Sequence, residues 1–290
     1  MCWPHAVRGD GLCETTVRAF ALAAMILFSA FSMMAETTNT LSDAEIKGRQ
    51  LAQQLCGTQP SENFTNNGVL KIRDAKGHSL EIPVRFEVLI TSTNWQSIYK
   101  ATHTNGLETL SVMHRNFQTD RPDGAVSGNN YFIAGSNDAQ LGSPNLYSYK
   151  GVRMISSSAT NEWKTQIKDR LIPFAGSDFW QCDLGLEFFH WPQQKVLPKT
   201  TNLKRGREYT LLESTNPHPS IYNYSRVITW IDKETGGILQ AEAYDKNGEL
   251  LKEFSPKSFK KVDGQWQLQE MEIRNVQTGS RTRLEFDLKK

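Results

Sequence analysis

The stretch SRVITWIDKETGGILQAEAYDKNGELLKEF, residues 225–254, decides the fold. It contains the strand-like runs 225–232 and 238–245 and the start of a third, 250–261, separated by the turn sequences KETGG and KNG. Gly, Asn and Asp favour such turns because they tolerate the backbone angles that tight turns need. Strands that recur every 8–12 residues or so, with short turns between them, predict an antiparallel sheet rather than alternating strands and helices.

The same alternation of strands and turns extends beyond this stretch. In residues 282–288 apolar side chains alternate with charged ones, which predicts a sheet with one buried and one solvated face. Residues 227–231 carry apolar side chains on both faces, so we expect that strand to be central. The apolar positions change phase between Leu268 and Met271, which predicts a β-bulge near residues 269–270. Further strands are predicted at 207–213, 266–276 and 282–288, with turns at 263–264 and 278–279.

Residues 42–134 add one helix and a second set of strands. Ser42 and Glu45 match a capping box, and Gly57 and Pro60 are expected to end the helix after about 13 residues. Its apolar residues share one face, so the helix needs a sheet to pack against. Pro83 predicts an edge position or a bulge, because proline has no N–H to donate to a neighbouring strand. Strands are predicted at 69–73, 79–91, 95–102 and 107–117, and a surface excursion over 119–150 holds a short strand at 131–134.

The segment IPFAGSDFWQCDLGLEFFHWP, residues 172–192, is strongly aromatic, and Trp163 just upstream adds to it. Each aromatic side chain buries about 150–250 Å², so this segment faces a core, a partner or an apolar ligand. Gly176 and Ser177 predict a turn followed by a helix N-cap, with Asp178 at the positive end of the helix dipole. We interpret the segment either as a helix and loop facing the core or as a lid over an apolar pocket.

Residues 1–35 have the composition of an export signal. Arg8 and Arg18 precede the apolar run 19–34, which is shorter than the roughly 20 residues that span a bilayer. A secretory signal peptide is predicted, with an uncleaved anchor as the alternative. The rest of the chain, 36–290, is predicted to form a single domain.

Charge and motifs exclude several classes of function. The chain has 33 basic and 31 acidic residues and a net charge of +2, whereas nucleic-acid binders concentrate basic residues in a stripe. The sequence has no Gly-rich phosphate loop, no HExxH, no nucleophile elbow and no CxxC. No enzyme activity, cofactor or nucleic-acid partner is therefore predicted. The basic residues that follow the aromatic segment are interpreted as a solvated face, or as a surface that steers an acidic partner or lipid headgroup: Lys195, Lys199, Lys204, Arg205 and Arg207.

The best candidate for a chemical centre is the group Cys182, Asp183, Glu187 and His190. On a helix, Glu187 and His190 would share one face, as in half of a carboxylate metal site, but a second Glu-x-x-His is missing. Neither a metal site nor catalytic residues are therefore predicted. Cys182 and Cys56 remain after signal cleavage, and the sequence leaves open whether they form a disulfide or stay as buried thiols.

Four short motifs carry a family resemblance. They are Ser-Asp-Phe at 177–179, Asp-Leu at 183–184, W-x-D-x-x-T at 230–235 and QTGSRT at 277–282. With these motifs the chain resembles the LolA-like outer membrane lipoprotein-sorting family specifically over about residues 165–290, and more weakly over 42–134. The resemblance implies a mainly β (α+β) fold, in which a curved antiparallel sheet forms an incomplete barrel and helices cover its concave face.

The same resemblance implies a function. It implies a non-catalytic, periplasmic carrier that sorts lipoproteins or carries lipids and holds acyl chains in an apolar cavity, membrane-associated if the signal is uncleaved. The expected partner is a lipid acyl chain or a lipoprotein. The alternative is an envelope interaction or lipid-sensing module that binds another protein. No individual lipid-binding residue is carried over from the family. The apolar side chains of this chain that are predicted to line the cavity are Phe179, Trp180, Leu184, Phe188, Phe189 and Trp230.

Overall fold

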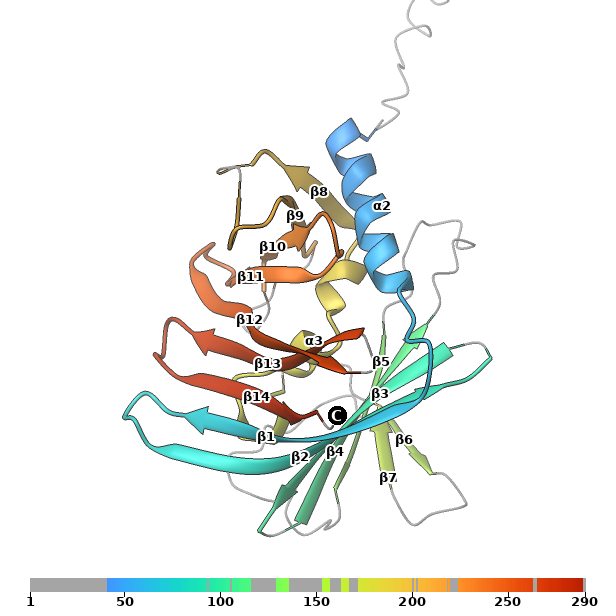
Figure 1. The fold of residues 1–290 in the computed structure, drawn as a ribbon, viewed down its shortest axis with the longest axis vertical. Coiled ribbons are helices and arrows are strands. Elements are labelled where there is room, and N and C mark those ends of the chain that lie inside the picture. Colours follow the sequence, from blue (N-terminus) through green and yellow to red (C-terminus); the bar gives the residue numbers. More distant parts are fainter. Residues whose placement is uncertain are drawn as a thin grey trace, which may run out of the picture. The chain divides into compact units, whose positions relative to one another are not determined.

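Residues 42–290 form one unit built on an antiparallel sheet (Figure 1). In the described part of the chain, 14 strands pair in the order β6-β7-β5-β4-β3-β2-β1-β14-β13-β12-β11-β10-β9-β8, and every pair is antiparallel. The sheet is curved and not closed, as predicted. This computed structural model describes residues 41–92, 94–104, 106–115, 129–135, 153–156, 163–166, 172–199, 201, 203–217, 219, 224–262 and 265–288. The predicted signal, 1–35, lies outside them.

The C-terminal strands confirm the predicted meander. Phe259 pairs with Leu268 and Ser258 pairs with Glu270, so Gln269 is the extra residue of the predicted bulge. The strand predicted to be central, β10, lies between β9 and β11. The edge strand β8 was not predicted, because its sequence is polar and basic. The strands are β8 (Gln193–Leu197), β9 (Tyr209–Thr215), β10 (Arg226–Asp232), β11 (Ile238–Tyr244), β12 (Leu250–Val262), β13 (Gln265–Asn275) and β14 (Arg281–Asp287).

The N-terminal strands extend the sheet on the other side of β14, to which β1 pairs. The predicted strands are present, whereas β6 and β7 were not predicted. Pro83 lies in an interior strand, but the register between β2 and β3 starts only at Val84, so β2 has no strand neighbour on that side at Pro83. The predicted excursion lies outside the described residues, apart from residues 129–135. The strands are β1 (Phe64–Arg73), β2 (Ser79–Ile90), β3 (Asn94–His103), β4 (Gly106–Arg115), β5 (Asn130–Gly135), β6 (Arg153–Ser156) and β7 (Trp163–Gln166).

The predicted helix is α2 (Asp43–Gly57), and its capping box is present. The backbone N–H of Ser42 donates to Glu45 Oε2 at 2.8 Å, and the N–H of Glu45 donates to Ser42 Oγ at 3.4 Å. The helix packs on β8 through Gly48, where a Cβ atom would lie only 2.5 Å from the backbone nitrogen of Lys195. Glycine therefore permits the close approach of helix and strand. In the residues that the structure describes, we find no helix with the length and hydropathy of a membrane span.

The aromatic segment, residues 172–192, is called the insert from here on. It contains the short helices η1 (Phe174–Gly176), α3 (Gln181–Leu184) and η2 (Glu187–His190), and it lies within the curve of the sheet (Figure 1). The predicted N-cap at Ser177 is wrong, because helix α3 starts four residues later, at Gln181. Ser177 Oγ instead accepts a hydrogen bond from the N–H of Phe179 at 3.1 Å. The insert therefore makes a turn at Ser177, and the Asp178 carboxylate contacts the sheet.

Candidate functional site

The insert packs against both halves of the concave face. Phe179 and Leu184 belong to a core cluster with side chains of β1 to β5, β13 and β14, among them Tyr99 and Leu284. Four aromatic residues of the insert instead pack against β9, β10 and β11, namely Trp180, Phe188, Phe189 and Trp191. In this second cluster Phe188 and Phe189 are buried and Trp180 is half-buried. The structure thus places five of the six residues predicted to line a cavity on the same side of the sheet, divided between two clusters.

The sixth predicted residue, Trp230, lies on the opposite face of the sheet. Side chains alternate along a strand, so Val227 and Ile231 of β10 point towards the insert while Trp230 points away from it. Trp230 packs with Tyr209 and Leu211, and Lys204 Nζ lies 4.3 Å from the centre of its ring. Trp230 is therefore separated from the other five candidates by the sheet.

A buried lysine joins the insert to the sheet. Lys252 of β12 has a side chain only 2% exposed, and its Nζ lies 3.2 Å from Asp183 Oδ2. The same amine donates to the carbonyl oxygen of Asp178 at 2.8 Å and lies 3.4 Å from the centre of the Trp180 ring. Burial lowers the pKa of Lys252, and the Asp183 carboxylate opposes that shift. An ion pair and a cation–π contact thus compensate for the burial of this charge.

Asp183 is the centre of this contact. The hydroxyl of Tyr224 donates to Asp183 Oδ1 at 2.8 Å, and the N–H of Trp180 donates to Oδ2 at 2.8 Å. The rings of Trp180 and Tyr224 stack at 5.0 Å, and burial raises the pKa of Tyr224 well above its ordinary value. Lys252 was not predicted from the sequence. It could have been found from its position two residues before Phe254, because residues two apart in a strand share a face, here the inward face of β12.

Asp178 makes a second attachment, to β14. Its carboxylate accepts hydrogen bonds from Ser280 Oγ at 2.5 Å and from Thr282 Oγ1 at 2.9 Å. Its backbone N–H donates to the same Thr282 hydroxyl at 2.9 Å. The Ser-Asp-Phe and QTGSRT motifs, far apart in the sequence, therefore meet in the structure, and together with the Asp-Leu motif they hold the insert on the sheet.

The fourth motif, W-x-D-x-x-T, organises a turn. Asp232 accepts hydrogen bonds from Thr235 Oγ1 at 2.7 Å and from the N–H of Glu234 at 3.2 Å. Arg207, from the basic run, lies 2.7 Å from the same carboxylate. The Arg207 guanidinium and these hydrogen bonds hold the pKa of Asp232 below its ordinary value, although burial opposes the shift.

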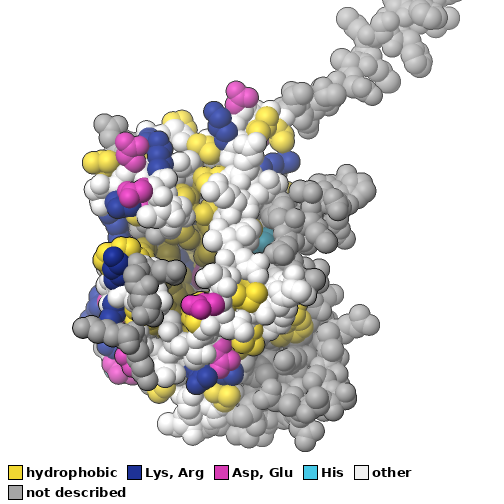
Figure 2. Space-filling model, turned by 45° about the vertical axis from the view of Figure 1, so that its right-hand side comes forward, with side chains coloured by type: hydrophobic (Ala, Val, Ile, Leu, Met, Phe, Trp, Pro, Cys, Tyr) yellow, Lys and Arg dark blue, Asp and Glu magenta, His cyan; other side chains and the backbone are white. Residues whose placement is uncertain are grey.

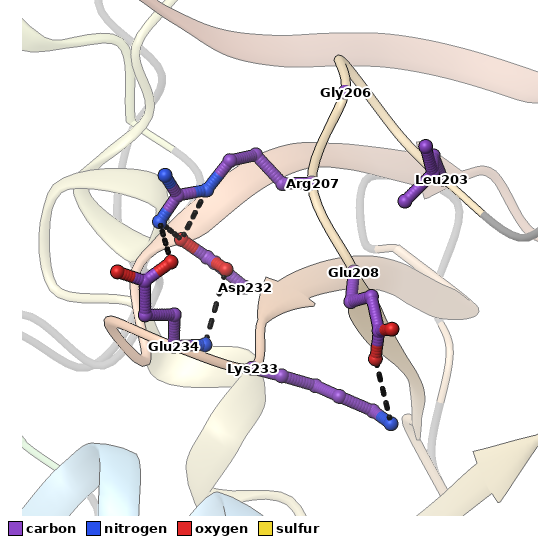
Figure 3. A pocket seen from close by; sticks show the side chains of 7 residues that line it. All are labelled: Leu203, Gly206, Arg207, Glu208, Asp232, Lys233 and Glu234. Carbon is purple, nitrogen blue, oxygen red and sulfur yellow. Dashed lines mark hydrogen bonds and ion pairs between the residues drawn. The ribbon is translucent and has the colours of Figure 1, made fainter.

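A pocket of about 420 Å³ lies beside this turn (Figure 3). Its charges are paired with one another: Arg207 with Asp232 and Glu234, and Lys233 with Glu208 (Figure 3). The pocket is polar and is not the apolar cavity that the sequence predicts. On the face drawn in Figure 2, hydrophobic side chains lie in small groups among charged ones. The residues that line the pocket are Leu203, Gly206, Arg207, Glu208, Asp232, Lys233 and Glu234.

Two of the residues considered for metal or acid–base chemistry, Asp183 and Glu187, bind side chains outside that group. Glu187 accepts a hydrogen bond from the Tyr131 hydroxyl at 3.0 Å, and Asp183 pairs with Lys252. Across the described ranges no group of three or more His, Cys, Asp or Glu side chains could hold a metal ion. Cys56 and Cys182 are both present as thiols, and burial raises the pKa of the Cys56 thiol to about 12.

Comparisons with known proteins address the fold. A family model described as "Uncharacterized protein" matches residues 159–289. A domain described as an outer membrane lipoprotein-sorting protein, from Vibrio parahaemolyticus, is similar in structure with a TM-score of 0.60. It is 18% identical, and the match covers 84% of this chain and 92% of that one. The chain has the LolA-like fold.

A second solved structure supports the LolA-like fold. A DUF1329-family protein from Desulfovibrio piger gives a TM-score of 0.58 at 19% identity, with 85% of this chain and 92% of that one covered. Comparison with curated proteins gives no match. The resemblance inferred from the sequence motifs is thus confirmed for the fold.

Proposed function

We propose that this protein is an exported, non-catalytic carrier of lipids or lipoproteins, which binds an acyl chain between the insert and the concave face. The observation that carries the proposal is the insert: an aromatic segment that covers an apolar face and is held there by side-chain contacts. Lys252 and Thr282 of the sheet, and Ser280 of the turn before β14, all bind the insert in this way. Contacts of this kind can be exchanged without breaking the pairing of the strands.

An acyl chain at this position would replace apolar contacts that the insert makes in the structure. Burial gains about 0.8 kcal/mol per methylene group, so a long chain offsets the loss of several such contacts. The side chains proposed to contact the chain are Phe179, Trp180, Leu184, Phe188 and Phe189. Trp230 lies on the other face and is not placed to contact it.

Export to the periplasm is part of the proposal and rests on the apolar run 19–34 behind Arg8 and Arg18. Intact-mass analysis of protein purified from a cell envelope tests it directly. The mass expected after cleavage is that of a chain starting near residue 36. A mass that includes residues 1–35 would favour the uncleaved anchor.

Lipid binding is tested by native mass spectrometry of the purified protein, followed by titration of the delipidated protein with a fluorescent fatty acid. We expect copurified lipid and saturable probe binding. Protein that yields no lipid and binds no probe would contradict the carrier function, and a protein ligand recovered without lipid would favour the interaction module. Trp180→Ala does not separate the two, because Trp180 also covers Lys252.

Movement of the insert has its own reporter, the Cys182 thiol, which is 5% exposed. Cys2 and Cys13 are lost when residues 1–35 are removed, which the intact mass shows. In a Cys56→Ser variant of that form, Cys182 is the one cysteine left in the sequence. We expect an acyl ligand to change its rate of modification by a thiol reagent. Asp178→Ala should speed both modification and probe uptake, whereas Leu186→Ala, at a position of the insert that is 38% exposed, should change neither.

A further inference from the structure

The β12–β13 hairpin exposes two aromatic side chains that none of the core clusters uses. Trp266 is 71% exposed and Phe259 is 53% exposed. Trp266 has the largest exposed fraction among the large apolar side chains that the structure describes. Exposed aromatic side chains in a group mark interaction surfaces, because their burial stabilises a complex.

The strand register places the two rings on one face of the hairpin. Phe259 lies opposite Leu268, and Trp266 lies opposite Lys261. Directly paired residues of antiparallel strands project to the same face, and diagonal neighbours lie about 7–8 Å apart. Phe259, Lys261 and Trp266 therefore form one surface, called the hairpin surface below.

The hairpin surface lies in a basic segment. Residues 256–268 contain three lysines and a single acidic residue. Lys257 pairs with Glu272 at 2.8 Å. The Lys260 amine donates to the carbonyl oxygen of Leu288, which is a neutral acceptor, so the positive charge of Lys260 is not neutralised. Lys261 is exposed. By strand alternation Lys260 projects to the other face of the hairpin, so Lys261 supplies the positive charge of the hairpin surface. This charge favours a negatively charged partner.

We propose that the hairpin surface docks the protein onto an anionic phospholipid membrane, with Trp266 and Phe259 at the level of the headgroups. Aromatic rings beside a lysine suit this interface, since both rings are apolar, the indole of Trp266 adds a polar N–H, and the lysine amine reaches the phosphates. Two rings cover far less than the roughly 1,000 Å² that a specific protein interface needs, which favours a membrane over a protein partner. The inference goes beyond the carrier function, because docking requires no guest under the insert.

The test is flotation of the full-length protein with two kinds of vesicle, phosphatidylcholine alone and an equal mixture of phosphatidylcholine and phosphatidylglycerol. Intact mass must show the same N-terminus for every variant, because the run 19–34 also has affinity for lipid. We expect preferential binding to the anionic vesicles, and weaker binding as salt rises. The Phe259→Ala/Trp266→Ala variant should bind them about tenfold or more weakly, and Trp266→Phe should keep most of the affinity.

Two further variants test whether vesicle binding is specific to the hairpin surface. One controls for nonspecific hydrophobic binding and the other for the contribution of charge. Leu80→Ala removes a side chain that is 56% exposed on β2, and it should leave vesicle binding unchanged. Lys261→Glu should weaken binding to anionic vesicles only. The double aromatic variant should still bind the fluorescent fatty acid, so a failure of docking and a failure of the carrier function are distinguishable. Wild-type binding that ignores lipid charge, or a double variant that floats like the wild type, would overturn the proposal.

Discussion

The two faces of the sheet carry the same kinds of contact at different depths. On the concave face, Lys252 covers the ring of Trp180 and pairs with Asp183. On the opposite face, Lys204 covers Trp230, and Arg207 pairs with Asp232, the last residue of β10. The side chain of Lys252 is 2% exposed, whereas that of Arg207 is 39% exposed. Both carboxylates are largely buried, Asp183 at 12% and Asp232 at 5% exposed, so the two pairs differ in whether the cation reaches water.

The largest effect is expected from Asp183→Ala. This change leaves the Lys252 charge buried without its carboxylate, and it also removes the acceptor for Tyr224. Loss of one partner of a buried ion pair costs about 3–5 kcal/mol. The free energy of unfolding, measured by urea titration, should fall by that amount.

A double variant provides the control for this prediction. Asp183→Leu/Lys252→Met replaces the pair with apolar side chains of similar length and leaves no uncompensated charge. Such replacements are often neutral or stabilising, so the double variant should recover much of the stability that Asp183→Ala loses. If Asp183→Ala unfolds like the wild type, the pair is not what distinguishes the two faces.

Acid is expected to destabilise the concave face first, through His114 of β4, which follows the core residues Leu110 and Val112 at alternate positions and so shares their face. Burial lowers the pKa of His114 to about 3, from an ordinary value near 6.5. Between those values the unfolded chain binds a proton that the folded chain does not, so stability falls as the pH falls. His114 should contribute a loss of about 2 kcal/mol between about pH 6 and pH 4.

The measurement is the unfolding free energy as a function of pH, compared with His114→Gln, which lacks the titrating ring and should show a shallower slope. Asp232, on the other face, has a lowered pKa, so its contribution is lost only as the pH falls below its ordinary value of about 3.9. Equal slopes for the wild type and His114→Gln would remove this distinction between the faces.

A smaller effect is expected from Thr282→Val. The change keeps the shape of a fully buried side chain and removes two hydrogen bonds with Asp178, one to the carboxylate and one from the N–H. Each such bond contributes about 1 kcal/mol, so a loss of about 1–2 kcal/mol is expected, with faster modification of Cys182. Ser280→Ala removes only the neighbouring hydroxyl and should have about half the effect. Loss of stability without a change at Cys182 would show that this attachment does not hold the insert.

The smallest effect is expected from Arg207→Ala. Asp232 keeps its hydrogen bonds to Thr235 and to the backbone of Glu234, and the lost guanidinium is partly in water. The guanidinium is 39% exposed and the 5% exposed Asp232 keeps these hydrogen bonds, so we expect a loss of about 1 kcal/mol or less and little change in thermal unfolding. A loss as large as that of Asp183→Ala would mean that depth does not separate the two pairs.

Local patterns were enough to predict most of the strands and the helix. The capping box at Ser42 and the bulge at Gln269 followed from short motifs and from a change of phase, both of which depend on neighbouring residues. The strand β8 was missed because its residues are polar and basic, and it is recognisable only by its pairing with β9. The predicted N-cap at Ser177 was wrong because contacts with β14, distant in the sequence, hold Asp178.

The candidate site could be predicted only in part, for the same reason. The apolar character of the insert was evident from composition, and five of the six candidate residues, four aromatic ones and Leu184, do lie on the concave face. The orientation of Trp230 depends on the register of β10, which composition does not give. The partnership of Lys252 with Asp183 joins residues 69 positions apart, and no local pattern contains such a pair.

The pairing of β1 with β14 also has a consequence for biogenesis. The first strand, β1, pairs on one side with β2 and on the other with the last strand, β14, so the sheet cannot be completed while the C-terminal residues are still being translated. Contacts between such distant parts of a chain form slowly. Joining the two halves of this sheet is therefore expected to be a late step, which waits for the synthesis of the final strand.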